Sequence, residues 1–293
     1  MSLLNTLLGD PPPSWAFEVS EAGIAWGRTA APGELDFRPL PEGAISVSPL
    51  RDNVQQPEVF AREVAALAPA EPRRNQRAAL ILPDYCARTA VLDFDSFPSG
   101  HEEQLALVRF RMKKAVPFDL ASAIVSYHPQ PTASGEKRID VVVALIPSEI
   151  VSRYEAPFRE VGFQPGEVTT STLAALNMVT PGGITMLAKI AGATLSVLAM
   201  KGGVIKLARC VELERVSAEE VLGVLHPTVA FIEDELKAVP NRLVLCGFGL
   251  RGDQESGAWA SELSMDVEPL RSRFGVPAPH NAGLMGYMEA IAA

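Results

Sequence analysis

The residue types most often used in catalysis form no recognisable motif in this sequence. His101, His128, His226 and His280 lack the spacing of a metal site such as H-E-x-x-H, so we expect surface or structural roles for them. The chain contains no Gly-x-Ser-x-Gly nucleophile elbow and no Gly-x-x-x-x-Gly-Lys-Ser/Thr phosphate loop. These observations predict no catalytic residue and no metal ligand.

The overall composition narrows the class of partner and the compartment. The formal net charge of −9 argues against a nucleic-acid partner, because neutralising phosphates needs an excess of Lys and Arg. Cys86, Cys210 and Cys246 are far apart and form no C-x-x-C pair, which fits a reducing cytoplasm better than a zinc site or a disulfide framework. No apolar run approaches the ~20 residues that span a bilayer, and no basic signal-peptide region is present, so we expect a cytoplasmic protein.

The first 13 residues read as an N-terminal tag and linker. Residues 2–8 place four leucines on one helical face, and the Gly- and Pro-containing segment 9–13 ends that pattern. The tag either contacts a partner or a membrane, or packs on its own domain or stays disordered; the sequence leaves both interpretations open.

With 293 residues, of which 47% are hydrophobic, the chain is long enough for two domains. Residues 15–20 and 23–28 predict a β-hairpin that opens the first one. A helix over 57–67 then leads to the apolar run 78–83, which has the length of a buried strand and is typical of α/β layering.

The stretch between Cys86 and Phe163 predicts a small inserted α+β unit with the order β-α-β-β-α. Its strands are expected near 89–94, 124–127 and 139–146. Ser99 and Glu102 have the spacing of a capping box at the start of its first helix, and Pro117 ends that helix.

The same helix carries four cationic residues, Arg109, Arg111, Lys113 and Lys114. They form either a basic contact for an acidic partner or a solvated face.

A second domain is predicted to begin after the Gly-Gly loop near residue 182. Three short strands, 184–190, 194–200 and 204–211, repeat the antiparallel opening of the chain. Ser217 and Glu220 form a second capping box, which begins a helical region that Pro227 should kink or split. A strand over 242–246 and two helices, about 253–263 and 281–291, close the chain.

In this order the segments resemble the PilM family of type IV pilus assembly proteins, which belong to the actin-like ATPase superfamily. Residues 80–84 resemble the family's strand with a proline turn, and Ala115-Val116-Pro117-Phe118 followed by 124–127 resembles its "I-P-F … D-Y" signature. Weaker similarities lie at 139–147, 160–165, 245–249 and 282–284.

The resemblance implies an α/β, two-lobed actin-like (RNase H-like) fold with an inserted small α+β subdomain and a shortened second lobe. Lobe I would span 14–180, with the insertion at about 86–164, and a reduced lobe II would span 181–293. The segment between Arg209 and Arg242 is shorter than in nucleotide-binding relatives, so we expect one wall of the nucleotide pocket to be missing.

In the actin-like fold, two facing hairpins that each carry Asp-x-Gly hold the phosphates and order Mg²⁺ water. At the first position this chain has Glu18-Val19-Ser20, and at the second Lys189-Ile190-Ala191, so a cation replaces one metal-facing anion and both glycines are lost. The resemblance therefore implies a vestigial nucleotide site and no cofactor. Its positions are Glu18, Ser20, Lys189, Gly192, Gly247 and Gly249.

Alternatives remain at two of these places. Lys189 could itself neutralise a phosphate beside Gly192, so that ATP binds without metal. Phe248 could fill the adenine space, or Gly247-Phe248-Gly249 could be only a strand-to-helix turn.

The function implied is a pseudo-ATPase scaffold at the cytoplasmic face of the inner membrane. It would bind the cytoplasmic tail of a PilN-like membrane protein in a cleft beside the inserted subdomain. Three alternatives stay open: an ATP-binding switch of the same fold, the cytoplasmic L-type component of a type II secretion system, and a filament-forming actin-like protein. The L-type alternative is weakened because those proteins carry a membrane span and this chain shows none.

Overall fold

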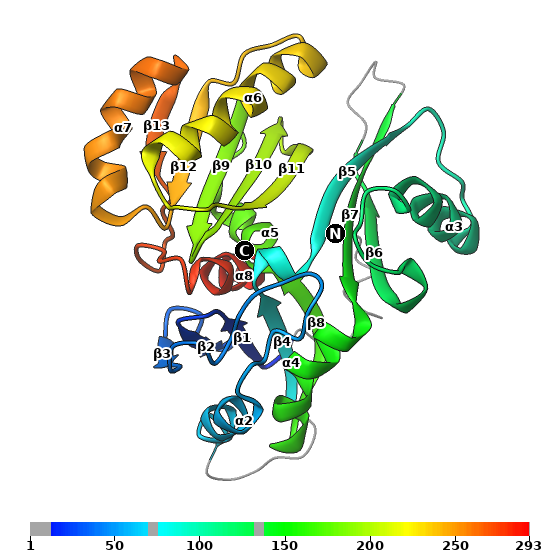
Figure 1. Cartoon of the computed structure of the whole chain (residues 1–293), viewed down its shortest axis with the longest axis vertical. Coiled ribbons are helices and arrows are strands. Elements are labelled where there is room, and N and C mark those ends of the chain that lie inside the picture. Colours follow the sequence, from blue (N-terminus) through cyan, green and yellow to red (C-terminus); the bar gives the residue numbers. More distant parts are fainter. Residues whose placement is uncertain (1–12, 70–75, 132–137, 293) are drawn as a thin grey trace.

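The computed structural model describes residues 13–69, 76–131 and 138–292 and contains three β-sheets (Figure 1). Except for Pro13, the predicted N-terminal tag lies outside the described residues. Among the helices that are described, none is both long and apolar enough to cross a membrane.

The first sheet has five strands in the order β3-β2-β1-β4-β8, in which β1 and β2 form the predicted hairpin and β4 and β8 run parallel to β1. One face is covered by α2 (Pro57–Ala65) and α4 (Ser148–Glu160), where aromatic rings from both helices pack with Phe17. The strands are β1 (Trp15–Val19), β2 (Gly23–Arg28), β3 (Leu35–Pro39), β4 (Gln76–Leu82) and β8 (Phe163–Thr170).

The second sheet repeats this plan in the order β11-β10-β9-β12-β13, with a meander of three antiparallel strands and two parallel additions. Its outer face is covered by α6 (Ala218–Leu236) and α7 (Gly249–Leu263), and the buried Trp259 belongs to this core. The strands are β9 (Ile184–Ala191), β10 (Thr194–Lys201), β11 (Val204–Glu212), β12 (Arg242–Cys246) and β13 (Asp266–Pro269).

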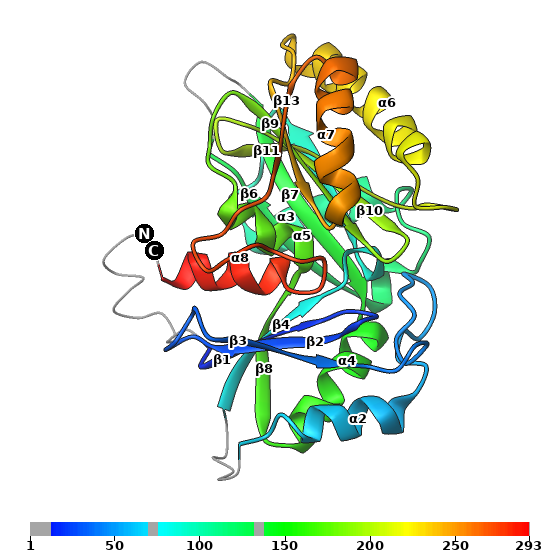
Figure 2. The same ribbon diagram turned by 90° about the vertical axis from the view of Figure 1, so that its left-hand side faces the viewer.

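Two helices, α5 (Ser171–Ala175) and α8 (Ala282–Ile291), lie between the two large sheets (Figure 2). Leu284 and Met288 of α8 pack on the first sheet, whereas Ala282 packs on the second. Both helices approach closely because Gly286 has no side chain: a Cβ there would overlap the carbonyl oxygen of Ala174. The short 3₁₀ helix η3 (Leu176–Met178) extends α5.

The third sheet, β5-β7-β6, has its own small core against α3 (His101–Met112). It is tied to the second sheet because the Gln130 side chain donates to the Ile205 carbonyl and accepts from its N–H, each at 2.7 Å. The remaining elements are β5 (Arg88–Phe94), β6 (Ala123–Pro129), β7 (Ile139–Pro147), η1 (Asp84–Cys86) and η2 (Leu120–Ser122).

Several local predictions are confirmed and others need correction. The β5-α3-β6-β7-α4 order is as predicted, but α4 packs on the first sheet instead of on the inserted unit. The capping box at Ser217 is present, since its Oγ accepts from the Glu220 N–H. The one at Ser99 is not, because α3 begins after Gly100 without a side-chain cap. Pro227 does not split α6, because the helix continues through it from Ala218 to Leu236.

Candidate functional site

A cavity of about 400 Å³ opens where the β1–β2 turn and the β9–β10 turn face each other. Four of the predicted site residues line it: Glu18, Ser20, Lys189 and Gly192. Gly247 and Gly249 line a second cavity of about 420 Å³. Pro279 lines both cavities, so they are neighbours, and the structure brings all six predicted positions into one region.

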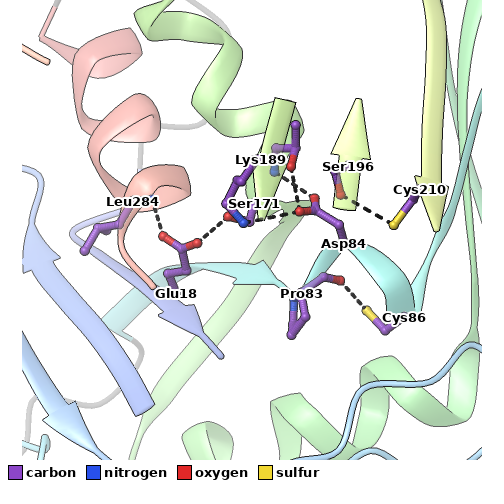
Figure 3. Close-up of polar contacts among 10 residues, drawn as sticks. Glu18, Pro83, Asp84, Cys86, Ser171, Lys189, Ser196, Cys210 and Leu284 are labelled. Carbon is purple, nitrogen blue, oxygen red and sulfur yellow. Dashed lines mark hydrogen bonds and ion pairs between the residues drawn. The ribbon is translucent and has the colours of Figure 1, made fainter. Parts of the chain in front are cut away.

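Glu18, from β1, is buried at the base of the first cavity and holds the starts of two helices (Figure 3). Its Oε2 accepts from the N–H of Leu284 at 2.7 Å, a donor in the first turn of α8 that has no partner within its own helix. Its Oε1 accepts from the hydroxyl of Ser171, the first residue of α5. Burial raises the pKa of Glu18, although Lys189 and these two donors oppose the shift.

Lys189, from β9, is 2% exposed, and its Nζ lies 3.3 Å from Oδ2 of Asp84 (Figure 3). Asp84 also accepts from the N–H and the hydroxyl of Thr172, at 2.7 and 2.6 Å. Burial alone would lower the pKa of Lys189, but Asp84 and then Glu18 outweigh it and raise the pKa. The ammonium is therefore charged and already paired within the protein.

Asp84 is a site residue that the sequence analysis missed. Its only local signal is its place directly after the buried strand β4 and Pro83. The contact that gives it a role joins residues 105 positions apart, which no local spacing reveals.

The two hairpin turns approach each other through Glu21 and Gly192. Gly192 has φ +57°, and a Cβ there would come within 2.5 Å of Glu21 Oε2. The other Glu21 oxygen accepts from the N–H of Val47 at 3.1 Å. Ser20 uses its hydroxyl inside its own turn, donating to the Gly23 carbonyl at 3.0 Å. A carboxylate, rather than an open backbone cradle, thus lies between the turns.

Charge in the first cavity is predominantly negative. Four carboxylates lie in its wall, and among the described residues that line it the ammonium of Lys189 is the only permanently cationic group. Burial lowers the pKa of His280, which keeps this ring neutral near pH 7. The carboxylates are Glu18, Glu21, Glu42 and Asp84. Within the described residues, no group of three or more His, Cys, Asp or Glu side chains is arranged to hold a metal ion.

The segment Gly247-Phe248-Gly249 forms a strand-to-helix turn between β12 and α7. Gly247 has φ +84°, and a Cβ there would overlap the carbonyl oxygen of Ile190, so only glycine fits. The Phe248 ring packs edge-on against Trp259, with ring centroids 5.4 Å apart. Phe248 thus joins the second core and also lines the second cavity.

The cysteines near this region are not nucleophiles. Burial raises the pKa of Cys210 and of Cys246 to about 12 and raises that of Cys86 well above its ordinary value. All three thiols are therefore protonated at neutral pH, and a protonated thiol is a poor nucleophile.

No family model matches the sequence, and no curated protein is significantly similar to it. Among solved structures, the "PilM-PilN type IV pilus biogenesis complex" is similar with a TM-score of 0.75 at 16% identity, over 97% of this chain and 100% of that chain. A Bacteroides thetaiotaomicron protein with an actin-like ATPase fold and unknown function gives a TM-score of 0.53 at 11% identity, over 92% and 94%. The chain has an actin-like fold.

The cytoplasmic domain of EpsL, an inner-membrane component of the type II secretion system of Vibrio cholerae, is a third similar structure. Its TM-score is 0.51 at 12% identity, over 95% of this chain and 94% of that chain. The actin-like fold explains why the two large sheets share one strand order. The fold class predicted from the sequence is confirmed.

Proposed function

We propose that this chain is a PilM-like cytoplasmic component of a type IV pilus or related secretion assembly at the inner membrane. In this proposal it binds the cytoplasmic tail of a PilN-like membrane protein and works without nucleotide. The observation that carries the proposal is the similarity to the PilM-PilN complex along the full length of both chains. The other two similar structures match less closely.

The chemistry of the first cavity supports a role without nucleotide. A phosphate bound there would meet the carboxylate of Glu21 beside Gly192, and like charges at short range in a partly buried site repel strongly. To neutralise it, Lys189 would have to leave Asp84, which would stay buried and unpaired. Lys189 also occupies the position at which Mg²⁺ would need an anionic side chain. The residues present therefore do not fit a magnesium nucleotide.

The part of the third sheet that lies at the edge strand β6, on the face turned away from α3, is a candidate surface for the partner's tail. Cross-strand neighbours share a face of a sheet, so the pairs Ile124↔Ile146 and Ser126↔Ala144 lie opposite the core that packs on α3. Ile124 is 47% exposed on this face. An exposed apolar side chain on an edge strand suits an extended peptide with apolar side chains.

Calorimetric titration with ATP, with and without Mg²⁺, tests the first half of the proposal. We expect no binding heat and no thermal stabilisation in either buffer. Micromolar binding that depends on Lys189 would overturn the nucleotide-free role and favour an ATP-binding switch.

Titration with the cytoplasmic tail of the PilN-like protein from the same cells tests the second half. We expect saturable binding that Ile124→Glu weakens at least tenfold while leaving stability unchanged, because the side chain is exposed. Leu50→Glu, at an exposed position outside the third sheet, is the matched control and should bind as the unchanged protein does. A tail that does not bind would overturn the proposed partnership.

The similarity to the EpsL domain supports a second candidate, the cytoplasmic component of a type II secretion system. The two candidates differ in the membrane protein that should co-purify with the chain from its own cells. Recovery of a secretion-system component in place of a PilN-like protein would favour the second.

A further inference from the structure

The C-terminal end of α3 and the two residues after it carry an exposed aromatic ring among cations, on a protein that is acidic as a whole. Residues 109–114 contain four basic side chains and no acidic one, against a net charge of −9 for the chain. Phe110, in the middle of this run, is 76% exposed, which is far more than Phe37 or Phe231 at 39% and 47%. Burial in the domain core does not explain this ring.

Lys113 and Lys114 are the cations that remain available at this place, since Arg109 is half-buried. Arg111 is engaged, because its guanidinium lies over the Phe94 ring at 5.1 Å and donates to the Asp93 carbonyl at 3.2 Å. Both lysines are exposed, and neither takes part in the ion pairs of the described residues. Their charge is free to act on something outside the molecule.

Phe110 and the two lysines form one surface, which we call the α3 tip. Lys113 is the C-cap of α3 and keeps a helical conformation, so the spacing of three residues places it next to Phe110, and Lys114 follows it directly. Val108 and Met112 are buried on the opposite side of the helix. Figure 1 shows α3 on the outer side of the third sheet, away from the two large sheets. Neither cavity of the candidate site includes an α3 residue.

We propose that the α3 tip binds directly to the surface of a membrane that contains anionic phospholipid. An exposed ring next to two ammonium groups at the end of a helix suits a flat, negatively charged surface, whereas an acidic peptide would be better held by a groove. The ring enters the boundary between headgroups and acyl chains, and the lysines remain at the headgroups. This inference uses no property of the proposed partner and stands if that partner is wrong.

The energetics predict a weak, reversible contact. A Lys near an anionic leaflet contributes a factor of about five in binding, and one aromatic ring adds a further modest factor. Such a contact does not anchor a protein alone. It becomes effective when a second, tethered interaction raises the local concentration at the membrane.

Co-sedimentation of the full chain with vesicles tests this inference. We expect binding to vesicles of equal parts phosphatidylglycerol and phosphatidylcholine, little binding to phosphatidylcholine alone, and a decline with added salt. Lys113→Gln with Lys114→Gln should reduce the partition coefficient about 25-fold, because the two factors of about five multiply. Phe110→Ala should reduce it further, and Phe110→Trp should retain binding, with quenching of its fluorescence by brominated lipid.

Lys201→Gln with Lys237→Gln is the matched control, since it removes the same charge from exposed positions outside α3. Equal losses for both double variants would show a general charge effect and overturn the proposal, as would binding without any preference for anionic lipid. Poly-glutamate binding that needs Lys113 and Lys114, with no vesicle binding, would show instead that the α3 tip recognises an acidic protein.

Discussion

Lys189 and Asp84 form an ion pair across the junction of the two five-stranded sheets, with 3.3 Å between Nζ and Oδ2. Asp84 directly follows β4 and Pro83, and Lys189 lies in β9. Their side chains are 2% and 8% exposed, so the low-dielectric interior strengthens the attraction while burial penalises each charge. The pair links the two halves of the molecule directly, at the wall of the first cavity.

Removing the cation should destabilise the protein strongly. We expect Lys189→Met to lower the free energy of unfolding by about 3–5 kcal/mol, because it leaves Asp84 charged and buried. Adding Asp84→Asn should restore part of this loss. Urea denaturation of the single and double variants measures the coupling, and strictly additive losses would contradict a direct interaction. Lys201→Met, at an exposed position, should change little.

The same substitution should have opposite effects at two helical glycines. Gly286→Ala should lower the free energy of unfolding by about 1–3 kcal/mol, because the added Cβ would collide with the Ala174 carbonyl. Gly223→Ala in α6 should raise it by about 0.5–1 kcal/mol, since nothing lies within 4 Å of the new Cβ and alanine favours helix. A gain at both sites in thermal denaturation would show that α5 and α8 are less closely packed than described.

Glu18 should make stability depend on pH in a defined direction. Its pKa in the folded protein lies above its ordinary value of 4.5, so the folded state binds this proton more tightly than the unfolded state does. The stability that this group contributes is therefore present at low pH and declines as the pH rises from its ordinary pKa through its raised pKa in the folded protein. Relative to Glu18→Gln, the unchanged protein should lose free energy of unfolding as the pH rises above 4.5. Urea titrations across this range measure the difference, and a constant value would refute the shift.

The two candidate helix caps should respond differently to alanine. Ser217→Ala should cost about 1 kcal/mol, because the Ser217 hydroxyl accepts from the Glu220 N–H at the start of α6. Ser99→Ala should change the free energy of unfolding by less than about 0.5 kcal/mol, as expected for an exposed residue outside the cap. Equal costs in thermal unfolding would mean that α3 begins one residue earlier in solution.

The sequence predicts the long, strongly patterned elements well but misses three of the edge strands, β3, β8 and β13. The hairpin at the start, the meander of the second half and the buried strands β4 and β12 follow from apolar runs and turn residues. β8 was not predicted because Pro165 and Gly166 interrupt its pattern; an edge strand tolerates them, since one side of it needs no partner. The short β3 and β13 are edge strands as well, with mostly exposed residues.

The site could be located from the sequence only through its resemblance to a family. That resemblance singled out Glu18 and Lys189, and the structure places both at one cavity. It did not indicate Asp84 or Glu21, because their roles depend on contacts with residues far away in the chain. Nothing in the local spacing shows that Lys189 is paired with Asp84 or that Glu21 lies against Gly192.

The position of α8 also determines when the protein can complete its folding during synthesis. Glu18 leaves the ribosome long before Leu284, which is 266 positions later, yet it bonds to the N–H of that residue. Ala16 and Ala25 likewise share their core with Met288. One face of the first sheet therefore stays uncovered until α8 has been synthesised. Until then, its apolar surface needs protection from other chains or from a chaperone.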